Sequence, residues 1–131
     1  MIGPLLFFAR SSWFDGAMSV PRLKTEIWVQ ACIRRADIEG TSVMVLRKGD
    51  PTSGALLIKR NRFAEGCTVL VETRNEAGAR AWYAGTGPAP VSEAEADAYI
   101  DRSRKRDPDL WVIEIEDRTG RLPFDEIVLV R

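Results

Sequence analysis

Four short apolar runs follow one another in the middle of the chain, at residues 43–46, 55–58, 67–71 and 80–83. Turn-forming residues separate them, and no connection is long enough to hold a crossover helix. Parallel neighbours need such a crossover, whereas antiparallel strands can be joined by tight turns. The spacing therefore predicts an antiparallel meander.

A first helix is predicted over residues 25–37, before these runs. Thr25 can serve as its N-cap, and Gly40 is a suitable residue to end it. Its polar residues recur at spacings of four, four and three and form one narrow stripe. Apolar residues cover most of the remaining circumference, so we expect this helix to be buried on most sides.

A second helix is predicted over residues 92–106, after the four runs. Ser92 and Glu95 form a capping box at its start, and Asp107-Pro108 ends it. Residues 110–116 then alternate between apolar and mostly polar side chains, which is typical of a strand with one buried face. A final apolar strand is expected over 127–130.

These elements predict an α+β fold: a mainly antiparallel sheet of five to six strands, with the two helices packed on one face. A length of 131 residues suits a single domain. We assign that domain to residues 21–131. Residues 1–20 are interpreted as an N-terminal extension, mobile or upstream of the true start, with Met18 as an alternative first residue.

Membrane insertion and secretion are not indicated by the sequence. The apolar stretch at 5–9 is far shorter than the roughly 20 residues that span a bilayer. No Lys or Arg precedes it, so the charged start of a signal peptide is missing. We therefore expect a cytoplasmic protein with no membrane span.

Histidine is absent from the chain, and there are two cysteines, Cys32 and Cys67, with no CxxC pair. This excludes Ser-His-Asp and Cys-His catalysis as well as histidine-ligated metals. Two distant thiols cannot form a zinc site alone. We expect both thiols to be reduced and buried, and we expect no cofactor.

Three segments resemble a known family: RLKTEIWVQACIRRA at 22–36, GALLIKRNR at 54–62 and DPDLWVIEIEDRTGR at 107–121. Phe124-Asp125-Glu126 follows the last of them. In this order the segments are similar to an uncharacterised alphaproteobacterial family known only as a domain of unknown function. The resemblance implies a short bacterial protein and carries over no activity, cofactor or catalytic residue.

Basic residues form the main candidate binding site. They follow the second apolar run and end the second helix: Lys59, Arg60, Arg62, Arg102, Arg104, Lys105 and Arg106. If these residues converge on one face, they would bind an acidic protein or a nucleic acid. The alternative is a set of solvated element ends, partly paired with an equal number of acidic residues.

Carboxylates in the last third of the chain form the alternative site. Asp109, Glu114 and Glu116 faintly resemble the Mg²⁺-binding core of a nuclease, although Glu116 stands where a Lys is expected. The competing interpretation is a solvated strand face beside acidic turns. If these carboxylates bind Mg²⁺, the protein would be a histidine-free, Mg²⁺-dependent hydrolase acting on phosphoesters.

The formal net charge is zero, with 19 basic and 19 acidic residues, so a general electrostatic attraction to nucleic acid is not expected. The function remains unknown from the sequence. The leading hypothesis is a non-enzymatic binding or adaptor protein with an unidentified protein or nucleic-acid partner. A homodimer that hides an edge strand, such as residues 127–130, is a further possibility.

Overall fold

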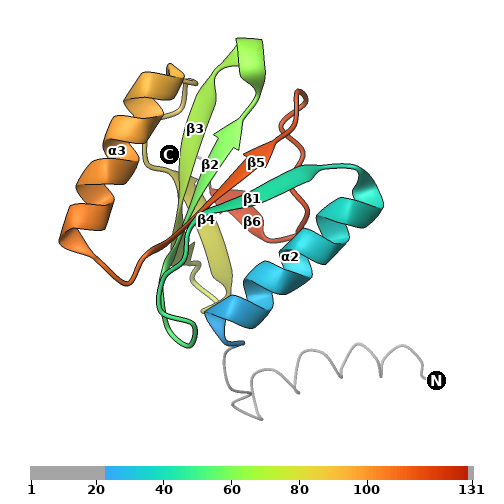
Figure 1. The fold of residues 1–131 in the computed structure, drawn as a ribbon, viewed down its shortest axis with the longest axis vertical. Coiled ribbons are helices and arrows are strands. Elements are labelled where there is room, and N and C mark those ends of the chain that lie inside the picture. The colour runs from blue at the N-terminus through green and yellow to red at the C-terminus, as the bar shows by residue number, and fades with distance from the viewer. Residues whose placement is uncertain (1–22, 130–131) are drawn as a thin grey trace.

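The computed structural model describes residues 23–129. The predicted extension at 1–20, the alternative start at Met18 and the end of the last predicted strand therefore lie outside the described residues. The elements in chain order are α2 (Thr25–Glu39), β1 (Ser42–Arg47), β2 (Leu56–Asn61), η1 (Phe63–Glu65), β3 (Cys67–Arg74), β4 (Arg80–Ala84), α3 (Glu93–Arg106), β5 (Trp111–Glu116) and β6 (Ile127–Leu129) (Figure 1).

The six strands form one sheet in the order β1-β5-β2-β3-β4-β6. The prediction of an α+β fold with up to six strands is confirmed. The expectation of a mainly antiparallel sheet is wrong, because β5 pairs parallel to β2 and β6 pairs parallel to β4. Strand β5 follows α3 in the chain and lies between β1 and β2. This long-range pairing cannot be inferred from the short connections between the earlier strands.

The two helices pack on opposite faces of this sheet, so the prediction that both cover one face is also wrong. Leu56 and Ile58 of β2 pack in one cluster with Trp28 of α2. Leu57, between them in the strand, packs in a second cluster with Ile100 of α3. Because successive strand residues point to opposite faces, α2 and α3 must lie on either side of the central strands (Figure 1).

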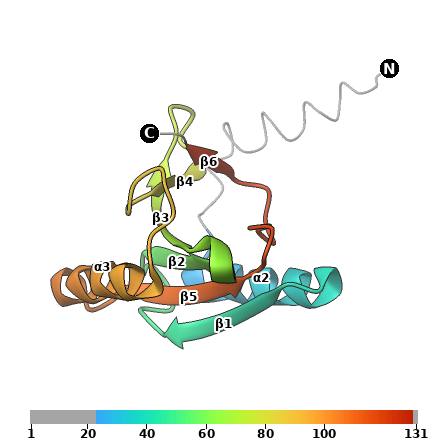
Figure 2. The same ribbon diagram turned by 90° about the horizontal axis from the view of Figure 1, so that it is seen from above.

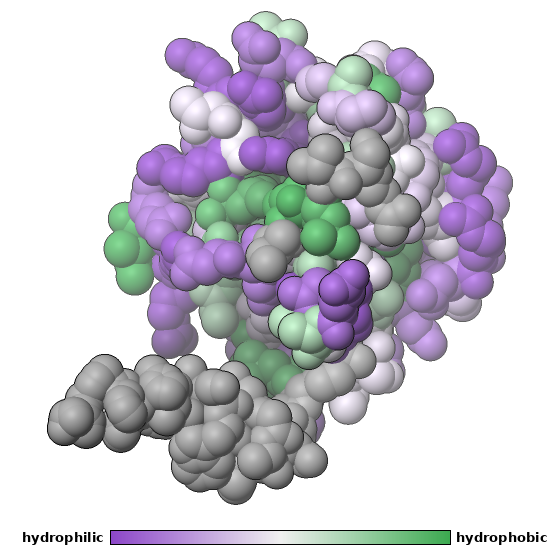
Figure 3. All heavy atoms as spheres, turned by 180° about the vertical axis from the view of Figure 1, so that it is seen from behind, coloured by the Kyte–Doolittle hydropathy of each residue, from purple (hydrophilic) through white to green (hydrophobic). Residues whose placement is uncertain are grey.

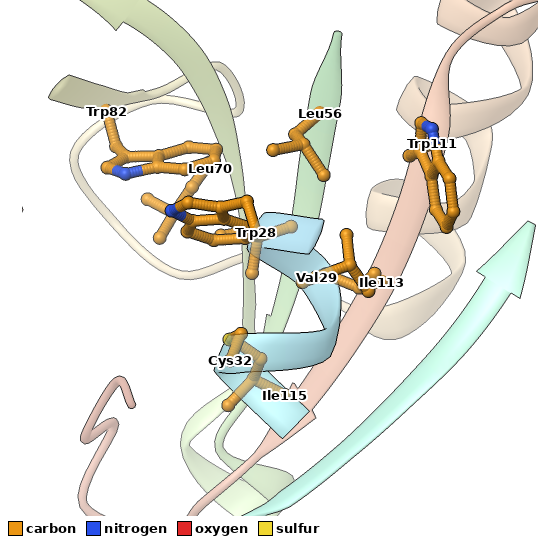
Figure 4. Packing of buried hydrophobic residues seen from close by; sticks show 10 residues of the cluster. Trp28, Val29, Cys32, Leu56, Leu70, Trp82, Trp111, Ile113 and Ile115 are labelled. Carbon is orange, nitrogen blue, oxygen red and sulfur yellow. The ribbon is translucent and has the colours of Figure 1, made fainter. Parts of the chain in front are cut away.

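The larger cluster lies under α2, where strand residues of the sheet meet one face of the helix (Figure 4). Trp28 and Trp82 pack with ring centroids 5.7 Å apart, and Phe124 contacts both rings. Both indole N–H groups donate to Glu126, at 3.0 and 2.9 Å. Trp28, Trp82 and Trp111 are all buried.

Helix α2 buries one face and leaves the other exposed, in contrast to the prediction of burial on most sides. Trp28, Val29 and Cys32 are buried, whereas Ile27 and Ile38 are exposed. Lys24 occupies the N-cap position. Thr25, the predicted cap, lies inside the helix and donates its hydroxyl to the carbonyl of Gly54 at 2.7 Å.

Both ends of the sheet are edges, and they differ in length. Seen from above, the sheet is curled, with β1 at one end and β6 at the other (Figure 2). Strand β6 has three residues and β1 has six. Among the described residues, no helix is both long and apolar enough to cross a bilayer.

Candidate functional site: the open edge of β1

The residues of the predicted basic site lie on both faces of the sheet. Lys59 and Arg60 are neighbours in β2 and point to opposite faces of the sheet. Lys59 is buried on the α3 side, whereas Arg60 donates from Nε to the carbonyl of Gly120 at 2.8 Å. Arg62 donates to the carbonyl of Arg118 at 3.3 Å. These side chains therefore serve the domain's own structure.

Lys59 is held by three carboxylates beneath the start of α3. Its Nζ lies 2.7 Å from Glu93 and 2.8 Å from Asp97, both of α3, and 3.7 Å from Glu114 of β5. Burial alone would lower the pKa of Lys59, but hydrogen bonds to Asp97 and Glu93 and the charge of Glu114 raise it above its ordinary value. The ammonium group therefore stays charged and is fully engaged.

The basic residues of α3 lie at the other end of that helix. Glu93 and Arg104 are eleven residues apart, about 16 Å along a helix. The structure therefore does not bring the 102–106 group together with Lys59. Arg102 lies over the ring of Tyr99, with 5.9 Å from its Cζ to the ring centroid. Arg104 and Lys105 instead approach the end of β1 and line a groove with Arg47.

The three carboxylates of the metal hypothesis do not converge. Asp109 is exposed and precedes β5, and Glu116 ends that strand, so their backbones are about 20 Å apart at the rise of an extended chain. Glu114, between them, accepts a hydrogen bond from Asn61 Nδ2 at 3.0 Å and pairs with Lys59. Across residues 23–129, no group of three or more potential metal ligands is found.

Both cysteines are buried and free of disulfides, as predicted. Burial, with a contribution from the charge of Glu126, raises the pKa of Cys32 to about 12. Burial likewise raises the pKa of Cys67. Neither thiol has the low pKa and accessibility of a reactive cysteine.

Three consecutive large apolar residues of β1 are exposed to solvent. Its pairing partner is β5 alone within the described range, so its outer edge is open (Figure 2). Met44, Val45 and Leu46 are exposed, and Met44 is 53% accessible. Exposed apolar side chains on an open strand edge mark a surface that can accept another chain.

A groove on the α2 side runs between α2 and β1. It has a volume of about 300 Å³ and is lined mainly by Val29 and Ile33 of α2, Val45 of β1 and Trp111 of β5. Lys48 and Glu26 form an ion pair of 3.5 Å at this groove. The floor of the groove is therefore apolar, with a polar rim.

A second groove, of about 320 Å³, lies on the α3 side of the same strand. Leu46 and Arg47 of β1 form one wall, Ile100 and Arg104 of α3 form the other, and Val112 lies between them. The Nε atom of Arg104 is buried and has no hydrogen-bond partner in the described structure. Apolar and cationic groups are thus combined on this side.

The sequence did not identify this edge. The run at 43–46 is continuously apolar, which is typical of a strand buried on both faces. The exposure of β1 depends on its position at the end of the sheet. That position depends in turn on where β5 inserts. The one local signal was the Arg47-Lys48 pair that follows the run, since basic residues often protect strand edges.

The back of the molecule has a separate hydrophobic area. There, hydrophobic groups gather in a central hollow with hydrophilic side chains around it (Figure 3). A small groove near β6 is lined by Leu70, Ala84, Val128 and Leu129, with Arg60 at its border. The described part of the predicted edge strand, β6 at Ile127–Leu129, lies at the end of the sheet.

The fold and the open edge define a small α+β domain, with a curled mixed sheet between two helices. A family model described as "Protein of unknown function (DUF1491)" matches residues 23–125, and the chain belongs to this family. This confirms the resemblance seen in the sequence. A search of curated proteins found no match.

Similar solved structures include proteins from two alphaproteobacteria. A crystal structure of a DUF1491 family protein from Caulobacter crescentus is 41% identical, covers 82% of this chain and all of its own, and gives a TM-score of 0.74. An NMR structure of a DUF1491 family protein from that species is 41% identical, covers 82% of this chain and 96% of its own, with a TM-score of 0.70. A protein from A. tumefaciens is 27% identical, covers 81% of this chain and 97% of its own, with a TM-score of 0.64.

Proposed function

We propose that the domain is a non-enzymatic binding module that takes a protein partner along the open edge of β1. The observation that supports this most is the exposure of Met44, Val45 and Leu46 on a six-residue edge strand with a groove on each side. In strand addition, main-chain hydrogen bonds provide affinity, and pockets for alternate side chains provide specificity. The β1 edge offers both features.

The contrast between the two edges supports β1 over β6. Proteins commonly protect edges by making them short, and the described part of β6 has three residues. Strand β1 is twice as long, and its one irregularity is a shift of register between Val45 and Arg47. Most of its length therefore remains suitable for pairing with another strand.

In-cell photo-cross-linking tests this function. A benzophenone amino acid replaces Met44 in one variant and Ala77, in the exposed β3–β4 turn, in the control. We expect a covalent complex with a discrete partner protein from the Met44 position and none from Ala77. Adding Val45→Lys, which places a charge beside the edge, should abolish the complex while the circular dichroism spectrum is unchanged.

Two results would contradict the proposal. One is equal cross-linking from Met44 and Ala77, which would indicate nonspecific encounter. The other is a complex that survives Val45→Lys, since a strand pairing at β1 would place its neighbouring side chain against the new charge.

A further inference from the structure

The two grooves beside β1 differ in chemistry, and this difference determines what a paired strand can contain. Side chains of an added strand point alternately to the two faces of the sheet. On the α2 face they would meet Val45, which is opposite Ile113, together with Ile33. On the α3 face they would meet Met44, which is opposite Glu114, and Arg47, which is opposite Val112.

Three basic side chains lie on the α3 side near the end of β1. Arg47, Arg104 and Lys105 line the adjoining grooves there, together with Asp97 and Asp101. Asp97 is already engaged by Lys59 at 2.8 Å. Asp101 lies 3.7 Å from Arg104 and is largely exposed, so it compensates for only part of this charge.

Arg104 has donor capacity that the described structure does not use. Its Nε is buried without a partner, and its closest carboxylate contact, from Nη1, is 3.7 Å long. A guanidinium group presents donors in a fixed planar arrangement that matches a carboxylate. A carboxylate entering the groove between Arg47 and Arg104 would meet the exposed part of the Arg104 side chain, which is 36% accessible.

We propose that a partner protein adds an extended acidic peptide to β1. Apolar and acidic side chains alternate along this peptide. Its apolar residues occupy the α2-side groove, and its Asp or Glu residues pair with Arg47 and Arg104 on the α3 side. This inference rests on the proposed function and specifies the partner's chemistry.

Selection from a library of random linear peptides displayed on phage tests this chemistry. We expect the purified domain to enrich peptides with apolar residues at every second position and Asp or Glu between them. A selected peptide should bind the double variant Arg47→Glu/Arg104→Glu about tenfold more weakly or worse. The same peptide with Lys in place of its acidic residues should bind that variant more tightly than it binds the wild type.

Two controls separate this result from loss of the fold or a general charge effect. Arg34→Glu/Arg106→Glu makes the same change in net charge at exposed positions away from the grooves, and it should bind the selected peptide like the wild type. Recovery of binding with the charge-reversed peptide shows that the Arg47→Glu/Arg104→Glu variant is folded.

Enrichment of basic or non-alternating peptides, or of none, would overturn the proposed chemistry. Unchanged binding by Arg47→Glu/Arg104→Glu would do the same. If the Met44 variant forms a cross-linked complex while the peptide tests fail, the proposed binding function stands. Only the proposed acidic chemistry of the peptide is then wrong. A dimer in light scattering that Val45→Lys dissociates would instead assign β1 to a second copy and overturn the proposal.

Discussion

Lys59 and Glu114 are direct register partners on the parallel strands β2 and β5, and their charged atoms lie 3.7 Å apart. Both side chains are nearly enclosed, with exposed fractions of 5% and 10%. A shift of either strand by one residue would move one charge to the opposite, apolar face. The pair therefore favours the register in which β5 inserts beside β2.

Replacing Lys59 with Met should destabilise the domain. The change leaves Glu114 buried without its cation, whereas Glu93 and Asp97 can turn toward water. We expect the free energy of unfolding to fall by about 3 kcal/mol in urea titrations. Lys105→Met, at an exposed position of α3, should change it by less than about 0.5 kcal/mol. Equal effects of the two changes would show that the buried ion pair has no structural role.

Replacing Glu126 with Gln should weaken the anchoring of the C-terminal strand. Glu126 accepts hydrogen bonds from the indoles of Trp28 and Trp82, one on each carboxylate oxygen. An amide has one acceptor oxygen and presents its NH₂ group to the second indole N–H. We expect a loss of about 1–3 kcal/mol in thermal unfolding, followed by tryptophan fluorescence. Glu76→Gln, in the β3–β4 turn, is the matched control. If Glu126→Gln destabilised the domain no more than Glu76→Gln does, the role of Glu126 as acceptor for both indoles would be refuted.

The two thiols should resist modification in the folded protein. Burial raises the pKa of both Cys32 and Cys67, so little thiolate is present at pH 8, and access is restricted as well. We expect both to react with a maleimide in guanidinium chloride and neither to react rapidly in buffer. Fast labelling of one thiol in the native protein would contradict its burial.

Acid should destabilise the domain partly through Asp117. Hydrogen bonds from the Thr119 hydroxyl and the Arg121 backbone N–H lower the pKa of this carboxyl below its ordinary value of 3.8. Because the folded pKa is the lower one, this contribution is present above pH 3.8 and is lost as the pH falls. Unfolding measured from pH 5 to pH 2.5 should therefore show a shallower loss of stability for Asp117→Asn. Parallel curves for the two proteins would contradict this assignment.

Local signals in the sequence predicted the elements well. The Ser92–Glu95 capping box is present, with the Glu95 N–H donating to the Ser92 hydroxyl at 3.1 Å. Gly40 ends α2 in the left-handed conformation, with φ of 78°. The alternation at 110–116 identified β5 as a strand, but the expectation of one buried face is wrong, because β5 lies between two strands and is buried on both faces. Each of these features depends on residues that are close together in the chain.

The arrangement of the elements depends on long-range pairing and was not predictable in the same way. The insertion of β5 between β1 and β2 makes the sheet mixed and leaves β1 at the edge. The partners of Lys59 come from α3 and β5, so its burial could not be inferred from its neighbours in the chain. The period of two along β2 places Lys59 and Arg60 on opposite faces, so the single basic site predicted from the sequence could not form around both.

Amide hydrogen exchange of the domain, free and bound to a selected peptide, tests strand addition at β1 most directly. In the free protein, the β1 amides that point away from β5 should exchange rapidly, because no strand of the described structure covers them. Binding should protect these amides and leave those of β6 unchanged. Unaltered exchange along β1 in the complex, or protection at β6 instead, would contradict the account.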